Sequence, residues 1–432
     1  MKKSAALLWD ESFLWGLMAY RALKTNNLPF ELIRSEDIKK GSLRDYEMLF
    51  VPGGWASNKL KALGDEGIRE IKGFVYNGGN YLGFCGGAGL ATLDGIGLLN
   101  IKRRATNQRL PSFSGRIYLN INKHYIWSKL KPDKKIGKHK DNSKSDSSLT
   151  THRLSLPFYA WWPSQFVIND KKIEILATYG KALPDSFSSD LNVGDIEANY
   201  NWSELERLYK INLDPKLLLN EPAVVEGNYG SGKVILSLLH FDTPNDKNSK
   251  IVLKNLWNYL VKTEENNSKR SKAQGRKTSK PQNFKTFPII SELESLVEEL
   301  ISFGSRNFLW FWRNPMLLQW RRGVRGLEYC TLYIMIKEMS KIIKRLDKKD
   351  EVIISNLESI KKLLIPFTEK AKQLLILERF AMKHGHITYE KCDDPKVQKI
   401  RLELFGNSKS YGGLFKRLVD QIDFTLYQLL KL

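Results

Sequence analysis

The stretch Tyr81-Leu-Gly-Phe-Cys-Gly-Gly-Ala-Gly-Leu-Ala91 decides the fold. A short apolar run leads into Cys85, and the small residues after it can open a helix. This order is typical of a strand–nucleophile–helix elbow, where a sharp turn strains the nucleophile and demands small neighbours, here Gly83 and Gly87. A thiol at a helix N-terminus is favoured as the thiolate by unpaired N–H groups and the positive dipole end. The alternative interpretation is a buried cysteine beside a tight turn.

Working outward from the elbow, strands and helices alternate. Strand patterns occur at residues 4–9, 30–33, 48–51 and 81–84, and helical patterns at 12–25 and 65–76. This alternation predicts an α/β fold with a doubly wound, mostly parallel sheet, in which ligands bind at the carboxyl ends of the strands. Gly53, Gly54 and Cys85 all fall at such ends, so we expect them on one edge of the sheet.

Beyond residue 99 the chain changes character twice. Residues of about 100–220 read as a β-rich insertion, with strands expected at 114–120, 166–168 and 173–179, and a hairpin is expected across the glycine-rich residues 227–233. We expect the α/β domain to end at residue 262, a basic flexible linker over 263–286 and an all-α domain over 287–432. The expected helices of this last domain include 327–346, 351–365 (ended by Pro366), 368–383 and 413–432. The aromatic and arginine-rich segment 307–322 reads as a buried helix with a basic rim, the alternative being a membrane-surface or partner contact.

A cysteine nucleophile needs a base, a group that orients the base and a site for the oxyanion. Of the six histidines, His124, His139 and His152 lie in or near the insertion and His384 and His386 in the helical region, whereas His240 follows a strongly predicted strand. Asp242 stands two residues on, and on an extended segment both side chains point to the same side. The alternative is a satisfied strand-end histidine with a capping aspartate. Gly53 and Gly54 offer backbone N–H groups suited to an oxyanion hole, or else form an ordinary turn.

Net charge and cysteine content limit the possible partners and cellular location of the protein. The 432 residues carry a formal charge of +22, much of it in the polar stretches 129–144 and 262–285, which read as solvated loops. Such a charge also suits nucleic acid, an anionic membrane surface or an acidic partner. Three scattered cysteines indicate no disulfide framework and favour a reducing, cytoplasmic location. We expect no metal site, no cofactor and no membrane-spanning segment.

Three pieces together resemble the class I glutamine amidotransferase-like superfamily, and most closely the domain at the N-terminus of biotin–protein ligases. They are Val51-Pro-Gly-Gly54, Gly78-Gly-Asn-Tyr-Leu-Gly-Phe-Cys-Gly-Gly-Ala88, and Gly232-Lys-Val-Ile-Leu-Ser237 followed by His240 and Asp242. The resemblance covers about residues 4–262. It implies a flavodoxin-like sandwich with Cys85 as nucleophile, His240 as base, and Gly54 with Gly86 as backbone oxyanion donors. The acid in the family is usually glutamate, so Asp242 is one methylene shorter.

Two functional hypotheses follow. The first is a cysteine-dependent hydrolase or amidotransferase-like enzyme that acts on an amide or related carbonyl through Cys85, His240 and Asp242. The second is a non-catalytic ligand-binding or regulatory module that retains the fold, with the helical domain as the part that binds a protein partner. A basic scaffold on a membrane or nucleic acid is a third interpretation.

Overall fold

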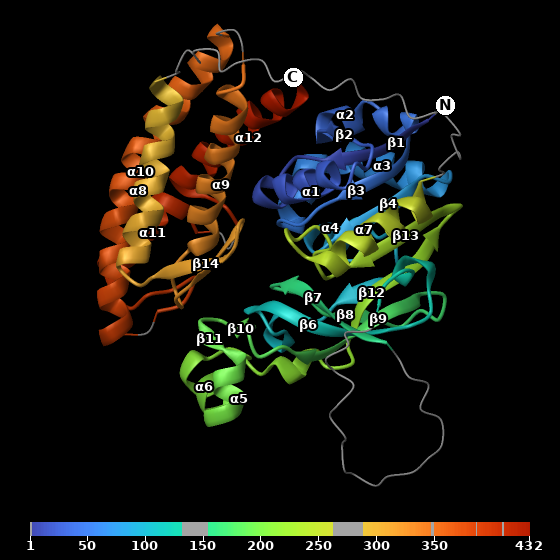
Figure 1. The fold of residues 1–432 in the computed structure, drawn as a ribbon, viewed down its shortest axis with the longest axis horizontal. Helices are drawn as coiled ribbons and strands as arrows, with labels where there is room; N and C mark the ends of the chain where they lie inside the picture. Colours follow the sequence, from blue (N-terminus) through green and yellow to red (C-terminus); the bar gives the residue numbers. More distant parts are fainter. Residues whose placement is uncertain (1, 132–153, 262–287, 347–349, 386, 408–409) are drawn as a thin grey trace. The chain divides into compact units, whose positions relative to one another are not determined.

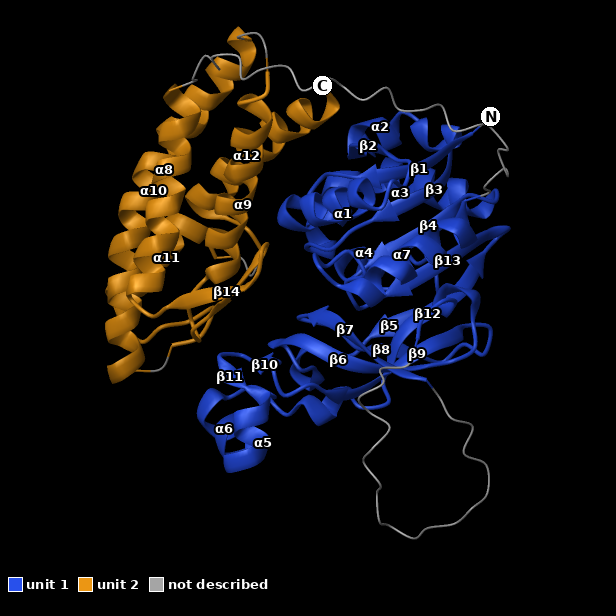
Figure 2. Ribbon diagram, in the orientation of Figure 1, with its two compact units in different colours: residues 1–262 blue, residues 263–432 orange. Residues whose placement is uncertain are grey.

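The computed structural model describes residues 2–131, 154–261, 288–346, 350–385, 387–407 and 410–432. The chain divides into two compact units, residues 1–262 (unit 1) and 263–432 (unit 2) (Figure 2). The expected linker 263–286 and most of the basic stretch 129–144 lie outside the described residues.

One half of the large sheet in unit 1 is parallel. Its strands are β1 (Lys3–Leu8), β2 (Glu31–Ile33), β3 (Tyr46–Val51), β4 (Asn80–Phe84) and β13 (Gly232–Ser237), in the spatial order β2-β1-β3-β4-β13 (Figure 1). The chain order of these strands reverses between β1 and β3, which is the switch point of a flavodoxin-like sheet. The helices are α1 (Phe13–Thr25), α2 (Ser35–Lys39), α3 (Ala56–Tyr76), α4 (Gly86–Leu90) and α7 (Lys247–Leu260). The predicted α/β fold is therefore confirmed.

The inserted β-rich region extends the same sheet as its antiparallel half. β12 (Pro222–Tyr229) pairs with β13 and β9 (Glu174–Ala182), and β6 (Phe113–Ile121) pairs with β9, β7 (Ser155–Trp161) and β10 (Phe187–Ser188). β11 (Leu191–Asn192) closes that edge. A separate ribbon joins β5 (Ile101–Arg103) to β8 (Phe166–Ile168), and two short helices, α5 (Val193–Asn199) and α6 (Trp202–Tyr209), follow β11. The hairpin expected across residues 227–233 is present between β12 and β13.

The core of unit 1 lies between the sheet and its helices. In the parallel half, β1, β3 and β4 are buried along most of their length, because helices cover a parallel sheet on its faces. Aromatic rings continue this core toward the antiparallel half, where Phe84 packs on Phe50 at 4.9 Å between ring centroids and on Phe241 at 5.6 Å. Phe241 in turn packs on Phe158 of β7 at 5.4 Å. This row of rings joins the end of β4 to the segment after β13.

Unit 2 is helical apart from one hairpin. Its helices are α8 (Pro288–Arg306), α9 (Gly326–Ile343), α10 (Glu351–His384), α11 (Pro395–Phe405) and α12 (Gly413–Lys431). The expectation of a buried helix over 307–322 is wrong, because β14 (Trp310–Asn314) and β15 (Leu317–Trp320) form an antiparallel hairpin there, and Phe308 and Phe311 are exposed. The expected helix end at Pro366 is also wrong, since α10 continues through it.

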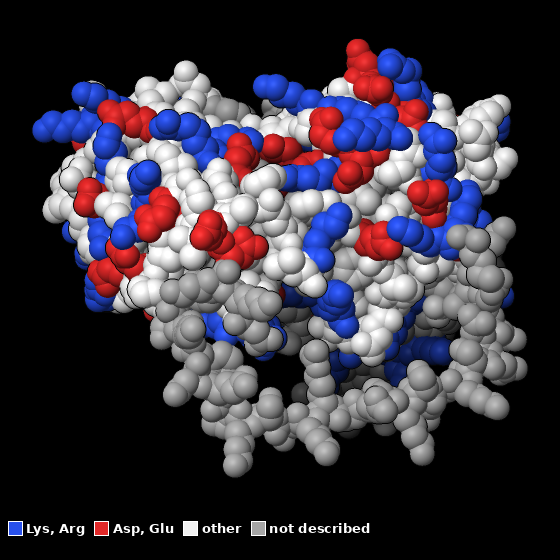
Figure 3. Space-filling view, turned by 90° about the horizontal axis from the view of Figure 1, so that it is seen from above, with Lys and Arg blue, Asp and Glu red and all other residues white. Residues whose placement is uncertain are grey.

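Surface charge is mixed rather than segregated. Basic and acidic side chains are interspersed over the face shown in Figure 3. In unit 2, for example, Lys337 pairs with both Glu294 and Glu298, and Lys344 pairs with Glu294 at 2.6 Å. No described helix is both long and apolar enough to cross a bilayer. Ion pairs of this kind offset individual lysines, while the excess of 69 Lys and Arg over 47 Asp and Glu remains.

Candidate active site

Cys85 occupies the sharp turn that its sequence context predicts. β4 ends at Phe84 and α4 begins at Gly86, so the cysteine is the single residue between strand and helix. Its φ is 48° and its ψ is −104°, a left-handed conformation that is strained for a residue with a side chain. Its N–H donates to the Ser237 carbonyl of β13 at 2.8 Å, which extends the parallel ladder to the cysteine. The residue is half-buried, so it is not sealed in the core.

Glycines let the β3–α3 turn approach the elbow backbone to backbone. A Cβ on Gly86 would overlap the carbonyl oxygen of Gly54, and a Cβ on Gly87 would overlap that of Val51. Gly54 itself has φ +109°, a conformation that other residues rarely adopt. Of the three glycines expected at the oxyanion site, Gly54 and Gly86 are therefore neighbours at one edge of the sheet. Gly53 has a different environment, since a Cβ there would lie 2.9 Å from the imidazole carbon Cε1 of His240.

His240 and Asp242 form a fully buried pair. Nδ1 of His240 lies 3.0 Å from Oδ1 of Asp242, and neither side chain is exposed. The residue between them, Phe241, points the other way into the row of core rings, which fixes the two polar side chains on the opposite side. The predicted proximity of this histidine and aspartate is present, but residues 240–243 form a turn instead of the expected extended segment, closed by the Thr243 N–H and the His240 carbonyl at 3.1 Å.

The pair is close to the cysteine. Burial opposes charge on the imidazole, but the Asp242 carboxylate outweighs it, and together with a smaller contribution from the Cys85 thiol it raises the pKa of His240 to about 10. Because Nδ1 is taken by Asp242, the nitrogen left for the sulfur is Nε2, which has no conventional hydrogen-bond partner among the described residues. The structure therefore brings Cys85, His240 and Asp242 together from β4 and from the segment after β13.

Aromatic side chains that the sequence did not single out hold the imidazole in place. The ring of Trp15, in α1, lies 4.5 Å from that of His240, at an angle of 32°. The backbone N–H of His240 donates to the carbonyl of Tyr159 in β7 at 3.1 Å. Two residues on, Trp161 Nε1 donates to the Thr243 hydroxyl at 3.0 Å, and that hydroxyl donates to the His240 carbonyl at 2.8 Å. β7 thus supports the histidine through both its backbone and its side chains.

The two other histidines that the structure describes lie away from Cys85. His124 lies 3.3 Å from Glu226 in a separate cluster, and His384 is exposed at the end of α10. His139, His152 and His386 lie outside the described residues. Among the described side chains, no group of three or more His, Cys, Asp or Glu is arranged to hold a metal ion.

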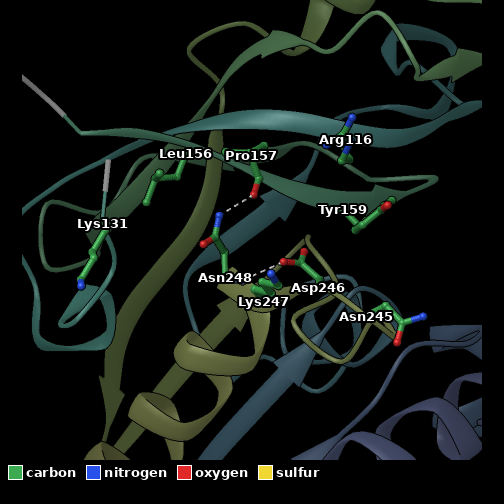
Figure 4. Close-up of a pocket in the computed structure, with 9 residues that line it drawn as sticks. All are labelled: Arg116, Lys131, Leu156, Pro157, Tyr159, Asn245, Asp246, Lys247 and Asn248. Atoms are coloured by element: carbon green, nitrogen blue, oxygen red, sulfur yellow. Dashed lines mark hydrogen bonds between the residues drawn. The ribbon is translucent and has the colours of Figure 1, made fainter. Parts of the chain in front are cut away.

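A cavity of about 370 Å³ lies beside this support rather than at the thiol. Its lining includes Arg116 of β6, Pro157 and Tyr159 of β7, and Asp246 and Asn248 near the start of α7 (Figure 4). Asn248 donates to the Pro157 carbonyl at 3.3 Å, and Asp246 caps α7 by accepting from the backbone of Asn248. The cavity shares Tyr159 with the histidine support but does not include the cysteine.

One protein family matches part of the chain. Residues 32–94 match the family described as biotin-protein ligase, N terminal. The matched segment runs from β2 to just beyond α4, so it contains Gly53, Gly54 and Cys85 but neither His240 nor Asp242. The resemblance inferred from the sequence is confirmed over these residues. No curated protein matches the chain.

Several solved structures with different activities are similar to part of the chain. A candidate GMP synthase component from Thermoplasma acidophilum is similar at 10% identity, with a TM-score of 0.37 over 60% of this chain and 95% of that one. A glutamine amidotransferase is similar at 17% identity, with a TM-score of 0.34 over 59% and 97%. A β-galactosidase from Rahnella sp. R3 is similar at 14% identity, with a TM-score of 0.35 over 60% and 31%. Because these proteins differ in chemistry, no activity follows from the likeness.

Proposed function

We propose that unit 1 is a cysteine-dependent hydrolase or amidotransferase-like enzyme that cleaves an amide or a related carbonyl compound. The observation that carries the proposal is the buried His240–Asp242 pair beside a half-exposed cysteine on a strained elbow. A histidine whose pKa is raised to about 10 is protonated at neutral pH. A neighbouring imidazolium favours the thiolate, which is the nucleophilic form of cysteine.

In the proposed reaction, the Cys85 thiolate attacks the amide carbonyl carbon and forms a carbon–sulfur bond. The carbonyl electron pair moves onto oxygen, where backbone N–H groups near Gly54 and Gly86 would hold the oxyanion. When the oxyanion collapses, the carbon–nitrogen bond breaks and the nitrogen takes the proton from Nε2 of His240. The neutral imidazole then removes a proton from water, which attacks the thioester and releases a carboxylic acid and the thiolate. Asp242 orients the ring throughout.

The chain provides its own controls for a test of the thiol. Cys330 is fully buried, its thiol donates to the Met316 carbonyl, and burial raises its pKa to about 12. Burial also raises the pKa of the partly exposed Cys392. We expect iodoacetamide at pH 7 to alkylate Cys85 at least tenfold faster than Cys392, as measured by peptide mass spectrometry, because among the described residues an imidazolium lies beside Cys85 and not beside Cys392.

Substitution separates this explanation from simple exposure. His240→Asn should slow the alkylation of Cys85 to about the rate of Cys392. His124→Asn, in the separate Glu226 cluster, should leave the faster alkylation of Cys85 unchanged. Ammonia release from a panel of primary amides, with Cys85→Ala as the blank, would then identify the substrate. A Cys85 that reacts no faster than Cys392, or that is indifferent to His240→Asn, would overturn the proposal in favour of a non-catalytic binding module.

A further inference from the structure

The hydroxyl of Tyr179 is a buried polar group that has no partner in the part of the protein that the structure describes. Tyr179 lies in β9 and is 0% exposed, yet none of the described residues makes a hydrogen bond to its hydroxyl. Buried hydroxyls are almost always hydrogen-bonded, because leaving one unpaired is unfavourable. Tyr81 shows the usual arrangement in the same sheet, since its buried hydroxyl donates to the Gly87 carbonyl at 2.7 Å. Among the described residues the Tyr179 hydroxyl therefore keeps an unused donor, which a molecule bound beside it would satisfy.

The register of the sheet places Tyr179 on the edge where Cys85 lies. Phe84 of β4 pairs with Ser237 of β13, which pairs with Val224 of β12, which pairs with Ala177 of β9; the register between β12 and β9 is irregular on both sides of this last pair. Two antiparallel steps make β9 run in the same direction as β4.

Cys85 follows Phe84 at the end of β4, and Tyr179 lies two residues after Ala177 in β9. Both residues therefore lie beyond this row, toward the carboxyl edge of the sheet. The electrostatics agree with this placement. Burial raises the pKa of the Tyr179 phenol, and the next largest contribution is the charge of the Cys85 thiol.

We propose that Tyr179 is a substrate-binding residue of this site, whose hydroxyl donates a hydrogen bond to an acceptor oxygen of the molecule bound at Cys85. The inference rests on the proposed function, because it assigns a role toward the same substrate. A phenol in this environment remains neutral across the working pH range and so stays a donor. The ligand class is thus a compound with a carbonyl or carboxylate oxygen beside the reacting carbon.

Two electrophiles of similar size test this assignment. Iodoacetamide carries a carbonyl acceptor next to its reacting carbon, whereas allyl bromide carries none. In Tyr179→Phe, we expect alkylation of Cys85 by iodoacetamide to slow about fivefold relative to allyl bromide, which is the effect of one net hydrogen bond. The melting temperature should not fall, because the lost hydroxyl had no partner among the described residues. Tyr81→Phe is the matched control, and it should lower the melting temperature because it removes the bond to Gly87.

The outcomes distinguish the two proposals. If Cys85 of the wild-type protein is unreactive toward both reagents, the proposed function fails and this inference fails with it. If Cys85 is reactive but Tyr179→Phe leaves the ratio of the two rates unchanged, only the role of Tyr179 is overturned. A marked drop in the melting temperature of Tyr179→Phe would show that the hydroxyl has a structural role and would also overturn it.

Discussion

Replacing Asp242 by asparagine tests the buried pair most directly. The His240 pKa of about 10 exceeds the ordinary value of 6.5, so protonation of the imidazole stabilises the folded state. This contribution is complete below pH 6.5 and is lost as the pH rises through 10. At pH 7 the pH is three units below the His240 pKa of about 10, and each unit corresponds to about 1.4 kcal/mol. Protonation of His240 therefore contributes about 4 kcal/mol to the free energy of unfolding. Breaking a buried ion pair by removing one partner is typically unfavourable by ~3–5 kcal/mol, so the two arguments agree.

The assay is urea unfolding of the full chain at pH 7 and pH 9.5, followed by circular dichroism. Asp242→Asn should lower the free energy of unfolding of unit 1 by about 3–4 kcal/mol at pH 7 and by less at pH 9.5. Asp94→Asn is the control, because Asp94 is half-exposed, lies 3.5 Å from Arg103 and should change stability by less than about 1 kcal/mol. A loss at pH 7 below about 1 kcal/mol for Asp242→Asn, or a wild-type His240 that titrates near pH 6.5 by NMR, would refute the reasoning.

Three further sets of substitutions check other parts of the structure by chemical denaturation. Gly86→Ala should destabilise unit 1 by about 2 kcal/mol or more, because its methyl group would overlap the β3–α3 turn, whereas Gly73→Ala has open space in the last turn of α3 and should stabilise it by about 0.5–1 kcal/mol. In unit 2, Arg325→Met should lower the free energy of unfolding by ~3–5 kcal/mol, because it leaves the fully buried Glu328 without its ion-pair partner. Adding Glu328→Leu should restore most of that free energy. Pro366→Ala should stabilise unit 2 by about 1 kcal/mol or more, because alanine restores a helical donor inside α10; no gain would show that the surrounding helix has adapted to the proline.

The centre of the site could be predicted because local chemistry determines it. Cys85 needs small neighbours to make its turn, and those neighbours are visible as a run of glycines. His240 and Asp242 stand two residues apart in a turn that the Thr243 N–H closes on the His240 carbonyl at 3.1 Å, and the apolar Phe241 between them belongs to the core. In each case the signal lies within a few residues of the chain.

The support of the site could not be predicted, because it depends on contacts between distant segments. β7 contains Pro157, and a proline in a sequence argues against predicting a strand there. Pro157 fits in β7 because β7 is paired with β6 along one edge. The opposite edge of β7 has no paired strand among the described residues, so a proline, which lacks a backbone N–H, removes no ladder hydrogen bond there. The role of Tyr179 depends on the register of four strands, which no local pattern encodes.

The same reason explains the corrections in unit 2. Aromatic residues at 307–322 suit a strand as well as a helix, and the hairpin there is set by pairing between Trp310 and Trp320. α10 passes through Pro366 because it packs against α8, α11 and α12, and this packing outweighs one lost hydrogen bond. The buried pair of Arg401 with Glu378 joins residues that are 23 positions apart, so periodicity could not reveal it.

The imidazole and its carboxylate are carried by one short loop, and this has a mechanical consequence. Any excursion of residues 240–243 moves both members together, so their 3.0 Å contact is preserved while the gap to the sulfur changes. Because Phe241 between them packs among the core rings, the packing of this one side chain sets the position of both polar groups.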